Sequence, residues 1–439
     1  MLKSWLSIIQ FIIIFLALPV YASEVNPDNP VGEVEQTRIS SLVGEVEQTR
    51  ISSLSEEKIN TPKIVSDYNS NELAVKAVDK HINLFTERIR EKFSLWLSRS
   101  GKYIELMKEI LKEEHIPEEI VFIPLIESGF SPYACSSARA VGYWQFIAST
   151  AKRYGLKINW WMDERRDPVK STVAAANYFK DLYGMFGSWN LAMAAYNAGE
   201  GKILKALNRT NTDDYWSLLD TKHIRRETKD YVPKFIAASM IANNPQDFGF
   251  EGIEYNPPLD YDEVTVNSPV DLEVVADCAE TDLEAIKELN PELRRWCTPP
   301  DVSKYTLRIP AGTKGIFLQN LSLIPKEERF SNEIYKVKKD DTFKKISKKT
   351  GIPVQIILDM NSLEKIIPLK SGMEIYIPPK GKFVLDTYDK ASVKKASIKK
   401  ASFKQKKKSF TKKRRASAGI KKVAVKYKKK SLKPSSKRT

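Results

Sequence analysis

Apolar residues recur at helical spacing through the first half of the chain. Between positions 71 and 114 they fall on one side of a helix, which is typical of helices with one buried face. The positions that define this face include Leu84, Phe85, Ile89, Phe93, Leu95 and Leu97. Further helices are predicted from Pro117 to about Glu127, over 172–186, over 189–197 between Ser188 and Gly199, and over 235–242. We therefore predict an all-α domain over 71–250.

A different pattern follows further along the chain. Short strands are predicted over 334–337 and 374–377, with one helix between them opened by Asp341 and a second over 353–360. This βααβ order defines a small module over 333–379. The segment 260–325 shows a weaker version, with a helix over 283–289 and a strand over 305–309. The predicted fold class is thus multidomain α+β, with an all-α domain followed by small βααβ modules.

The start of the chain predicts export. Residues 1–22 combine Lys3, an apolar stretch and a final Val-Tyr-Ala, which is typical of a cleaved signal peptide. A membrane anchor is the alternative, but the apolar stretch is short of the roughly 20 residues that a helical span needs. Residues 23–70 are polar, and 31–42 recur unchanged as 43–54, so we predict a disordered linker with a tandem duplication.

A strongly basic tail occupies 388–439. Of the 71 basic residues in the chain, 22 lie in 390–439, which contains no Asp or Glu. The net charge of +16 therefore belongs to the tail, and the rest of the chain is net acidic. Such a run is predicted to be disordered and to attract polyanions. In an exported protein these are anionic membrane, lipopolysaccharide or the cell wall, and the signal peptide disfavours the nucleic-acid interpretation.

One glutamate stands out as a candidate acid. Glu127 ends an apolar run over 121–126, and Gly129 follows two residues later. A carboxyl held in a poorly solvated cleft tends to keep its proton, and a protonated Glu can act as a general acid on a glycosidic bond. A Glu at the edge of a core helix is the structural alternative.

Four further motifs accompany Glu127 in order. They are Gly-Tyr-Trp-Gln-Phe at 142–146, Trp-Met-Asp-Glu-Arg-Arg-Asp-Pro at 161–168, Ala-Ala-Tyr-Asn-Ala-Gly at 194–199 and Glu-Thr-Lys-Asp-Tyr-Val at 227–232. With Glu127, this set resembles the lysozyme-like domain of lytic murein transglycosylases, and the motif at 161–168 narrows the resemblance to the membrane-bound lytic murein transglycosylase D family. The resemblance is strong over 116–244 and extends more weakly over 71–379.

The resemblance implies both a reaction and the residues that perform it. Glu127 would act as acid and then base on the MurNAc–GlcNAc β-1,4 bond of peptidoglycan, leaving a 1,6-anhydro-MurNAc end without using water. The substrate-binding residues carried over by position are Ser128, Gln145, Tyr196, Asn197 and Tyr231. Tyr143, Trp144 and Phe146 are either cleft wall or core, and Tyr143 departs from the Leu or Met expected after Gly142.

Other kinds of catalysis have little support. Three histidines without paired ligand spacing predict no metal site, and no cofactor is expected. Asp163, Glu164 and Asp167 are candidates for the second carboxylate of a hydrolase. Their neighbouring arginines favour ion pairs that hold a loop instead.

The βααβ module resembles the LysM domain, which binds glycans containing N-acetylglucosamine. The candidate glycan-binding residues are Asp341, Thr342, Phe343 and Asn361. Asp340 departs from the glycine usual before Asp-Thr, which predicts a different turn there. The segment 260–325 is interpreted as a degenerate LysM-like unit or a spacer.

The cysteines allow a disulfide. Cys278 and Cys297 bracket the 260–325 unit, and the oxidising compartment of an exported protein favours a disulfide between them, with two buried thiols as the alternative. Cys135 is the odd one and is expected to be a free core residue.

Together these patterns predict an exported lytic transglycosylase of the periplasm or cell envelope, active in cell-wall turnover. Its partners would be peptidoglycan strands, a GlcNAc-containing glycan at the LysM module, and an anionic surface at the tail. A lysozyme-type muramidase and an inactive peptidoglycan-binding scaffold are the alternatives.

Overall fold

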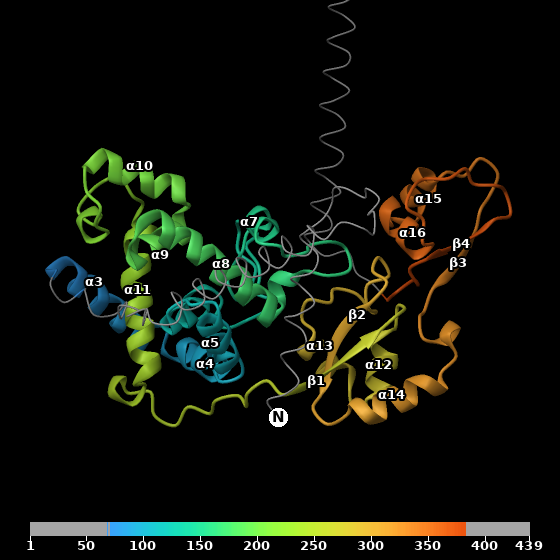
Figure 1. The fold of residues 1–439 in the computed structure, drawn as a ribbon, viewed down its shortest axis with the longest axis horizontal. Helices are drawn as coiled ribbons and strands as arrows, with labels where there is room; N and C mark the ends of the chain where they lie inside the picture. The colour runs from blue at the N-terminus through green and yellow to red at the C-terminus, as the bar shows by residue number, and fades with distance from the viewer. Residues whose placement is uncertain (1–67, 69–70, 383–439) are drawn as a thin grey trace, which may run out of the picture. The chain divides into compact units, whose positions relative to one another are not determined.

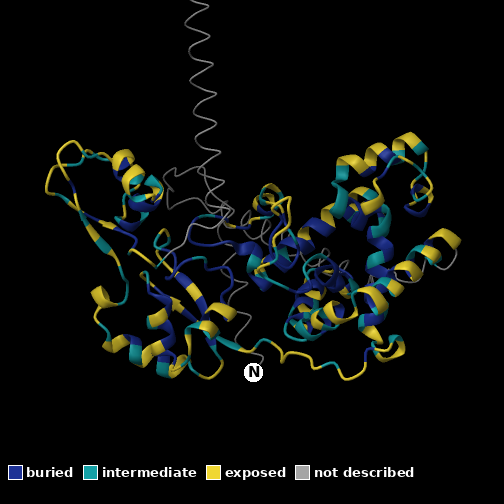
Figure 2. Cartoon of the chain, turned by 180° about the vertical axis from the view of Figure 1, so that it is seen from behind, coloured by how far each residue is buried: buried dark blue, intermediate teal, exposed yellow. Residues whose placement is uncertain are grey.

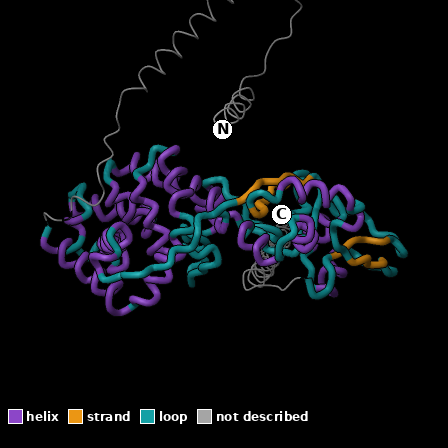
Figure 3. Tube along the Cα trace, turned by 90° about the horizontal axis from the view of Figure 1, so that it is seen from below, coloured by secondary structure: helices purple, strands orange, loops and turns teal. Residues whose placement is uncertain are grey.

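The computed structural model describes residue 68 and residues 71–382. The predicted signal peptide and basic tail lie outside these described residues, as does nearly all of the predicted linker. Helices make up the part before residue 250, and two-stranded antiparallel sheets occur only in the part after it, within the described chain (Figures 1 and 3). No helix in the described part is both long and apolar enough to cross a bilayer.

The helical part is built from short and medium helices. They are α3 (Glu72–Asn83), α4 (Arg90–Ser100), α5 (Ile104–Glu113), α6 (Ile123–Glu127), α7 (Ala148–Arg153), α8 (Pro168–Phe186), α9 (Trp189–Ala198), α10 (Glu200–Thr210) and α11 (Arg226–Asn243). A π-helical turn, Leu84–Arg88, joins α3 to α4. The all-α prediction for this part is confirmed.

Local capping explains where two of these helices begin. Asp167 caps α8, because its Oδ1 accepts from the backbone N–H groups of Val169 at 2.9 Å and Lys170 at 2.8 Å. With Pro168 in the first turn, the helix begins four residues before the predicted 172. Ser188 caps α9 as predicted, with its Oγ accepting from the N–H of Leu191 at 3.5 Å.

Other boundaries were predicted less well. The segment after Pro117 forms a 3₁₀ turn, Glu118–Phe122, before α6, so it is not one continuous helix. Helix α11 begins at Arg226 and not at 235, because Pro233 lies inside it without ending it. Helices α7 and α10 were not predicted.

The core of the helical part lies where α11 and α8 meet their neighbours. Helix α11 packs against α3 and α9, and α8 packs against α5 and α9. Figure 2 shows dark-blue buried residues concentrated along these inner faces. Among the largest fully buried side chains here are Phe85, Phe93, Trp144, Phe179 and Phe235. Burial of this apolar surface is the main force that holds the helices together.

The second part contains an α/β unit after residue 260. Strands β1 (Tyr261–Val266) and β2 (Tyr305–Pro310) pair antiparallel, with Tyr261 opposite Pro310. Helices α12 (Leu272–Cys278), α13 (Leu283–Leu289) and α14 (Lys314–Leu323) complete it. Helix α13 and strand β2 confirm the predicted elements of this unit.

The last described unit has the predicted βααβ order. Strands β3 (Glu333–Lys336) and β4 (Glu374–Ile377) pair antiparallel, with helices α15 (Phe343–Thr350) and α16 (Val354–Met360) between them. Asp340 has a φ of 65°. Aspartate therefore occupies the left-handed conformation that a glycine adopts without strain, and Asp is among the few residues that tolerate it.

The predicted disulfide is wrong in this structure. Cys278 and Cys297 are both free and both buried. Cys278 packs in the core of the β1–β2 unit, whereas Cys297 packs in a separate apolar cluster with Trp161 and Phe343. The alternative of two buried thiols therefore holds. Cys135 is free as expected, but it is exposed and not part of a core.

Candidate active site

Glu127 lies at the end of α6, where the chain turns sharply. Gly129 has a φ of +59° and the buried Phe130 has a φ of 54°. A Cβ atom on Gly129 would lie 2.1 Å from Cδ1 of Trp96. Only glycine fits this position, because both the backbone conformation and the indole exclude a side chain. The chain can therefore pass close to Trp96 directly after Glu127 because position 129 carries no side chain.

The surroundings of Glu127 favour its protonated form. Its side chain is half-buried. Burial raises the pKa of the Glu127 carboxyl, while the Tyr231 hydroxyl and the Lys234 ammonium lower it and Glu227 raises it further. The net direction is upward, so desolvation outweighs the hydrogen bond and the nearby cation. A carboxyl of this kind can deliver a proton at a higher pH than an exposed Glu can.

Helix α11 supplies two polar groups beside Glu127. Tyr231 Oη donates to Glu127 Oε1 at 2.7 Å. Lys234 Nζ donates to the backbone oxygen of Ile126 at 3.0 Å, and burial lowers the pKa of this ammonium. The sequence motif contains Tyr231 but stops before Lys234. Their i, i+3 spacing places both on one helix face, and this was the signal that could have identified Lys234.

Ser128, which directly follows Glu127, forms a hydrogen bond with the motif at 142–146. Its Oγ is 2.8 Å from the backbone oxygen of Tyr143 and 3.1 Å from that of Pro124, and it donates its proton to these carbonyls. The hydroxyl oxygen keeps lone pairs that can accept from a ligand N–H. Ser128 thus lies beside the acid while anchored to two other segments.

Gln145 lies in a strained turn that the backbone holds. It has a φ of 49°, and its Nε2 donates to the backbone oxygens of Gly142 at 2.9 Å and Ala134 at 3.2 Å. No hydrogen bond joins it to Glu127. Its side-chain N–H groups are therefore used within its own turn, and no described hydrogen bond uses its side-chain oxygen.

Tyr196 and Asn197 come from the end of α9. Tyr196 Oη donates to the backbone oxygen of Trp144 at 2.7 Å, and its ring stacks on Phe179 with centroids 4.7 Å apart. Burial raises the pKa of the Tyr196 hydroxyl, and the nearby Glu127 raises it further. Thr228 Oγ1 donates to Asn197 Oδ1 at 3.1 Å, which fixes the amide. Thr228 was missed as a site residue, although it belongs to the motif that contains Tyr231.

The aromatic residues of the 142–146 motif form core and not cleft wall. Tyr143, Trp144 and Phe146 are all buried. Trp144 Nε1 donates to Thr172 Oγ1 at 3.0 Å, which satisfies its only polar group. A Cβ atom on Gly142 would lie 1.8 Å from the backbone oxygen of Arg165. The motif therefore packs directly against residues 163–167, which we call the acidic loop.

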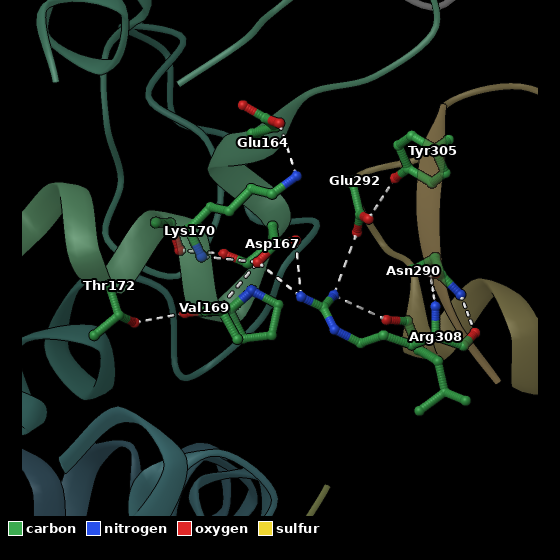
Figure 4. A network of polar contacts seen from close by, with 12 residues as sticks. Glu164, Asp167, Val169, Lys170, Thr172, Asn290, Glu292, Tyr305 and Arg308 are labelled. Atoms are coloured by element: carbon green, nitrogen blue, oxygen red, sulfur yellow. Dashed lines mark hydrogen bonds and ion pairs between the residues drawn. The ribbon is translucent and has the colours of Figure 1, made fainter. Parts of the chain in front are cut away.

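That acidic loop is held by ion pairs, as its sequence predicts. Arg165 Nη2 lies 2.7 Å from Asp163 Oδ2, and Lys170 Nζ lies 2.8 Å from Glu164 Oε1. Asp167 accepts from Arg308 of strand β2 at 3.0 Å and 3.2 Å, as Figure 4 shows. These three carboxylates are therefore engaged by cations, and none of them hydrogen-bonds with Glu127.

The same loop contacts the segment before β2. Arg294 N donates to the backbone oxygen of Trp161 at 2.9 Å, and Asp163 N donates to that of Glu292 at 2.8 Å. Arg308 lies between Asp167 and Glu292, and Tyr305 Oη donates to Glu292 Oε1 at 2.8 Å (Figure 4). All four of these side chains are buried. The loop is thus part of one polar network with residues 290–308.

The LysM candidates mostly hold their own module together. Asp341 Oδ2 accepts from Tyr335 Oη at 2.9 Å, and Thr342 caps α15 through the N–H of Lys345 at 3.2 Å. Phe343 is buried in the module core. Asn361 Nδ2 donates to the backbone oxygen of Tyr376 at 2.7 Å, and its Oδ1 accepts from the N–H of the same residue at 2.8 Å. Asn361 thereby fixes strand β4.

Comparison with protein families gives three matches along the chain. Residues 106–219 match the family described as "Transglycosylase SLT domain". Residues 260–326 match "Lytic transglycosylase MltD, LysM-like domain", and residues 335–378 match "LysM domain". The first match contains Glu127, Gln145 and Asn197.

Comparison with individual proteins gives partial matches. Membrane-bound lytic murein transglycosylase D of Escherichia coli K12 is 43% identical over 156 residues, which cover 34% of each chain. Membrane-bound lytic murein transglycosylase C of Pectobacterium atrosepticum is 27% identical over 165 residues, covering 32% of this chain and 46% of the relative. The chain thus spans about a third to a half of the length of these curated relatives.

Comparison with solved structures also gives partial matches. The 70 kDa soluble lytic transglycosylase of E. coli is 20% identical, with a TM-score of 0.30, and the match covers 56% of this chain and 42% of that one.

Proposed function

We propose that this chain, which belongs to the membrane-bound lytic murein transglycosylase D family, cleaves peptidoglycan glycan strands without water. The observation that supports this most is the setting of Glu127. The pKa of this carboxyl is raised by burial, one hydroxyl donates to it at 2.7 Å, and among the described residues no second carboxylate hydrogen-bonds with it. A single acid suits a reaction in which one residue first donates a proton and then accepts one.

In the first step Glu127 protonates the oxygen between MurNAc and GlcNAc. The C1–O bond then breaks, and the N-acetyl carbonyl of MurNAc stabilises the positive charge that develops at C1. The proton leaves Glu127, which becomes a carboxylate. Tyr231 is placed to stabilise that carboxylate, because its hydroxyl donates to Oε1.

In the second step the Glu127 carboxylate accepts the proton of the MurNAc C6 hydroxyl. The C6 oxygen closes on C1 and gives the 1,6-anhydro ring. Glu127 is then protonated again, so the cycle balances with no water consumed. Lys234 lies near enough to lower the pKa of Glu127 through its charge, which also favours the carboxylate between the two steps.

The neighbouring side chains would orient the sugar. Ser128 can accept from the N-acetyl N–H, because its own proton is engaged by backbone oxygens. Asn197 can donate through its amide, since Thr228 occupies the carbonyl oxygen. Tyr196 would shape the floor of the site, because its hydroxyl is used by Trp144 and its ring by Phe179.

The remaining parts of the chain would hold the enzyme on its substrate. The proposal includes export through the first 22 residues to the periplasm or cell envelope. The module that matches LysM would bind GlcNAc-containing glycan. The basic tail would contact an anionic surface of the envelope.

A muramidase that uses water is the rival reaction. It needs a second carboxylate to activate water or to attack C1. Asp163, Glu164 and Asp167 are engaged in ion pairs, which leaves Glu227 as the carboxylate whose charge acts on Glu127. Glu227 is exposed and one helical turn before Tyr231.

Mass spectrometry of peptidoglycan digests tests the proposal. The native protein is expected to release anhydro-MurNAc ends, and Glu127→Gln is expected to release none. Reducing MurNAc ends would establish the hydrolase instead. Products from neither protein, with wall binding retained, would identify a binding scaffold.

A further inference from the structure

A basic pocket lies next to the candidate active site. Its volume is about 230 Å³. The lining residues are Asn197, Ala198, Lys202, Lys205, Ala206, Arg209, His223, Ile224, Arg225, Glu227 and Thr228. Helix α10 provides one wall, and the segment that leads into α11 provides the other. The floor includes the buried Ala206 and Ile224.

The charges around this pocket are mostly positive. Lys202, Lys205, Arg209 and Arg225 line it, and Glu227 is the one acid among the lining residues. Lys202 donates to the backbone oxygen of Ala198 at 2.7 Å. In the described part of the chain, no carboxylate lies within ion-pair distance of the other three cations. Unpaired cations that converge on one hollow attract an anionic group.

The pocket borders the groups that surround Glu127. Thr228 and Asn197 line it and hydrogen-bond with each other at 3.1 Å. Thr228 is three residues before Tyr231 on α11, roughly 4.5 Å along the helix axis. Tyr231 in turn donates to Glu127. The pocket and the candidate active site therefore share Asn197 and Thr228.

The size of the pocket limits what it can hold. Pockets that enclose a whole small ligand have volumes of about 300–1,000 Å³. A pocket of about 230 Å³ suits one end of a larger molecule, such as a carboxyl-bearing side group. The arginines can meet a carboxylate with two parallel hydrogen bonds.

We propose that this pocket binds a carboxylate of the stem peptide carried by the glycan strand. The proposal rests on the proposed function, which places a MurNAc beside Glu127. Each MurNAc in unprocessed peptidoglycan bears an acidic peptide on its lactyl group, so cleavage beside MurNAc brings carboxylates close to the site. The pocket then makes the enzyme prefer strands that keep their peptides.

The test compares two substrates with the full-length protein. One is glycan strands with intact stem peptides, and the other is the same strands after an amidase has removed the peptides. The measured quantity is kcat/KM on the peptide-bearing strands divided by kcat/KM on the strands without peptides. The native protein should prefer the peptide-bearing strands. Lys205→Gln combined with Arg209→Gln should lower that ratio by roughly five- to twentyfold, since each exposed ion pair contributes a factor of up to about five.

A matched double variant controls for loss of charge. Arg88→Gln combined with Lys112→Gln also removes two exposed cations from the helical part, away from the pocket. It should keep the native preference. If the ratio of kcat/KM values fell equally in both double variants, the effect would come from overall charge. That result would contradict the proposed role of the pocket. Folding of each variant is checked by its thermal unfolding midpoint.

Free peptide separates the possible sources of the anion. Stem peptide released by the amidase should inhibit the native protein competitively and should inhibit the pocket variant more weakly. Inhibition by inorganic phosphate alone, with none by the peptide, would overturn the proposal. The proposal would also be overturned if the pocket variant kept the native preference for peptide-bearing strands but bound vesicles of phosphatidylglycerol more weakly. That result would assign the pocket to a lipid surface. If the native protein cuts neither substrate, the proposed function itself fails, which is distinct from a pocket failure.

Discussion

Tyr231 on α11 donates a hydrogen bond of 2.7 Å to the carboxyl of Glu127 at the end of α6. The two residues are 104 positions apart in sequence, so only the packing of α11 against α6 brings them together. The bond favours the carboxylate, while burial favours the acid. Burial and the Tyr231 hydrogen bond therefore act in opposite directions on the proton affinity of Glu127, and substitution can separate them.

Removing the Tyr231 hydroxyl should shift the pH dependence of activity upward. Tyr231→Phe deletes a group that lowers the pKa of Glu127, so that pKa rises and the acid form persists to higher pH. The alkaline limb of the kcat/KM profile should move to higher pH even though the rate falls. Tyr183→Phe, whose ring stacks on Trp189, is the control and should leave the limb in place. A limb that moves to lower pH would contradict this assignment.

Glu127→Gln should lose activity and gain stability. General acid catalysis contributes about 10²- to 10⁴-fold, so product formation should fall by at least that range. A raised pKa in the folded protein means that stability is present at low pH and lost as pH rises through that pKa. The glutamine variant should therefore unfold at a higher temperature than the native protein near neutral pH and at a similar temperature in acid. Glu118→Gln, an exposed change in the adjacent turn, should alter neither property.

Gly129→Ala should damage the site more than Gly187→Ala does. Both glycines have positive φ, 59° and 64°, so an alanine is strained at either position. At Gly187 the added methyl meets nothing within 4 Å, whereas at Gly129 it would lie 2.1 Å from Trp96. We expect Gly187→Ala to cost about 1 kcal/mol and to keep full activity. Gly129→Ala should cost more and lower kcat. Equal effects of the two changes in unfolding and kinetic assays would rule out a role for the Trp96 contact.

The Arg308–Asp167 pair should be costly to break. Arg308 is buried and donates to both oxygens of Asp167, so Arg308→Met leaves two buried carboxylates without their cation. Removing one partner of a buried ion pair typically costs about 3–5 kcal/mol. Lys76→Met removes an exposed pair with Glu72 and should cost less than about 1 kcal/mol. Urea unfolding of the two variants measures both values, and similar midpoints would contradict the structural role.

Glu292 should make stability depend on pH near neutrality. Burial and the charge of Asp167 raise the pKa of the Glu292 carboxyl to about 7, although Arg308 lowers it. Because the folded pKa is raised, its contribution to stability is present at acidic pH and lost as pH rises through about 7. Glu292→Gln should flatten the dependence of the unfolding temperature on pH between 6 and 8, a range set by that pKa. An unchanged slope would contradict a pKa of about 7 for Glu292.

Local patterns predicted much of the fold. The cap at Ser188 and the helix 283–289 follow from residues that act on their immediate neighbours. Helix α8 begins earlier than predicted, because Asp167 caps it and Pro168 lies in its first turn. Helix α11 was predicted too short, since tertiary packing stabilises it in spite of Pro233. Such packing is set by residues distant in sequence and leaves little local signal.

The site was predicted as a set of residues and not as a set of contacts. The motifs identified Glu127 and Tyr231, which the structure places in contact. They could not show that Phe343 and Asn361 stabilise the module in which they lie, or that Gln145 donates to backbone oxygens. They also could not show that Cys278 and Cys297 lie in different apolar clusters. Each of these depends on which chain segments meet in space, and a single sequence does not contain that information.

The contacts of Asp163 and Asp167 with residues 292 and 308 also determine how the chain can be shortened. A fragment ending near residue 250 would retain every side chain that touches Glu127. It would nevertheless leave Asp167 without Arg308, and the backbone oxygen of Trp161 without the N–H of Arg294. Both residues belong to the segment against which Gly142 packs. A fragment that carries the acid and keeps these contacts must therefore extend beyond strand β2, further than the boundary that helix content alone suggests.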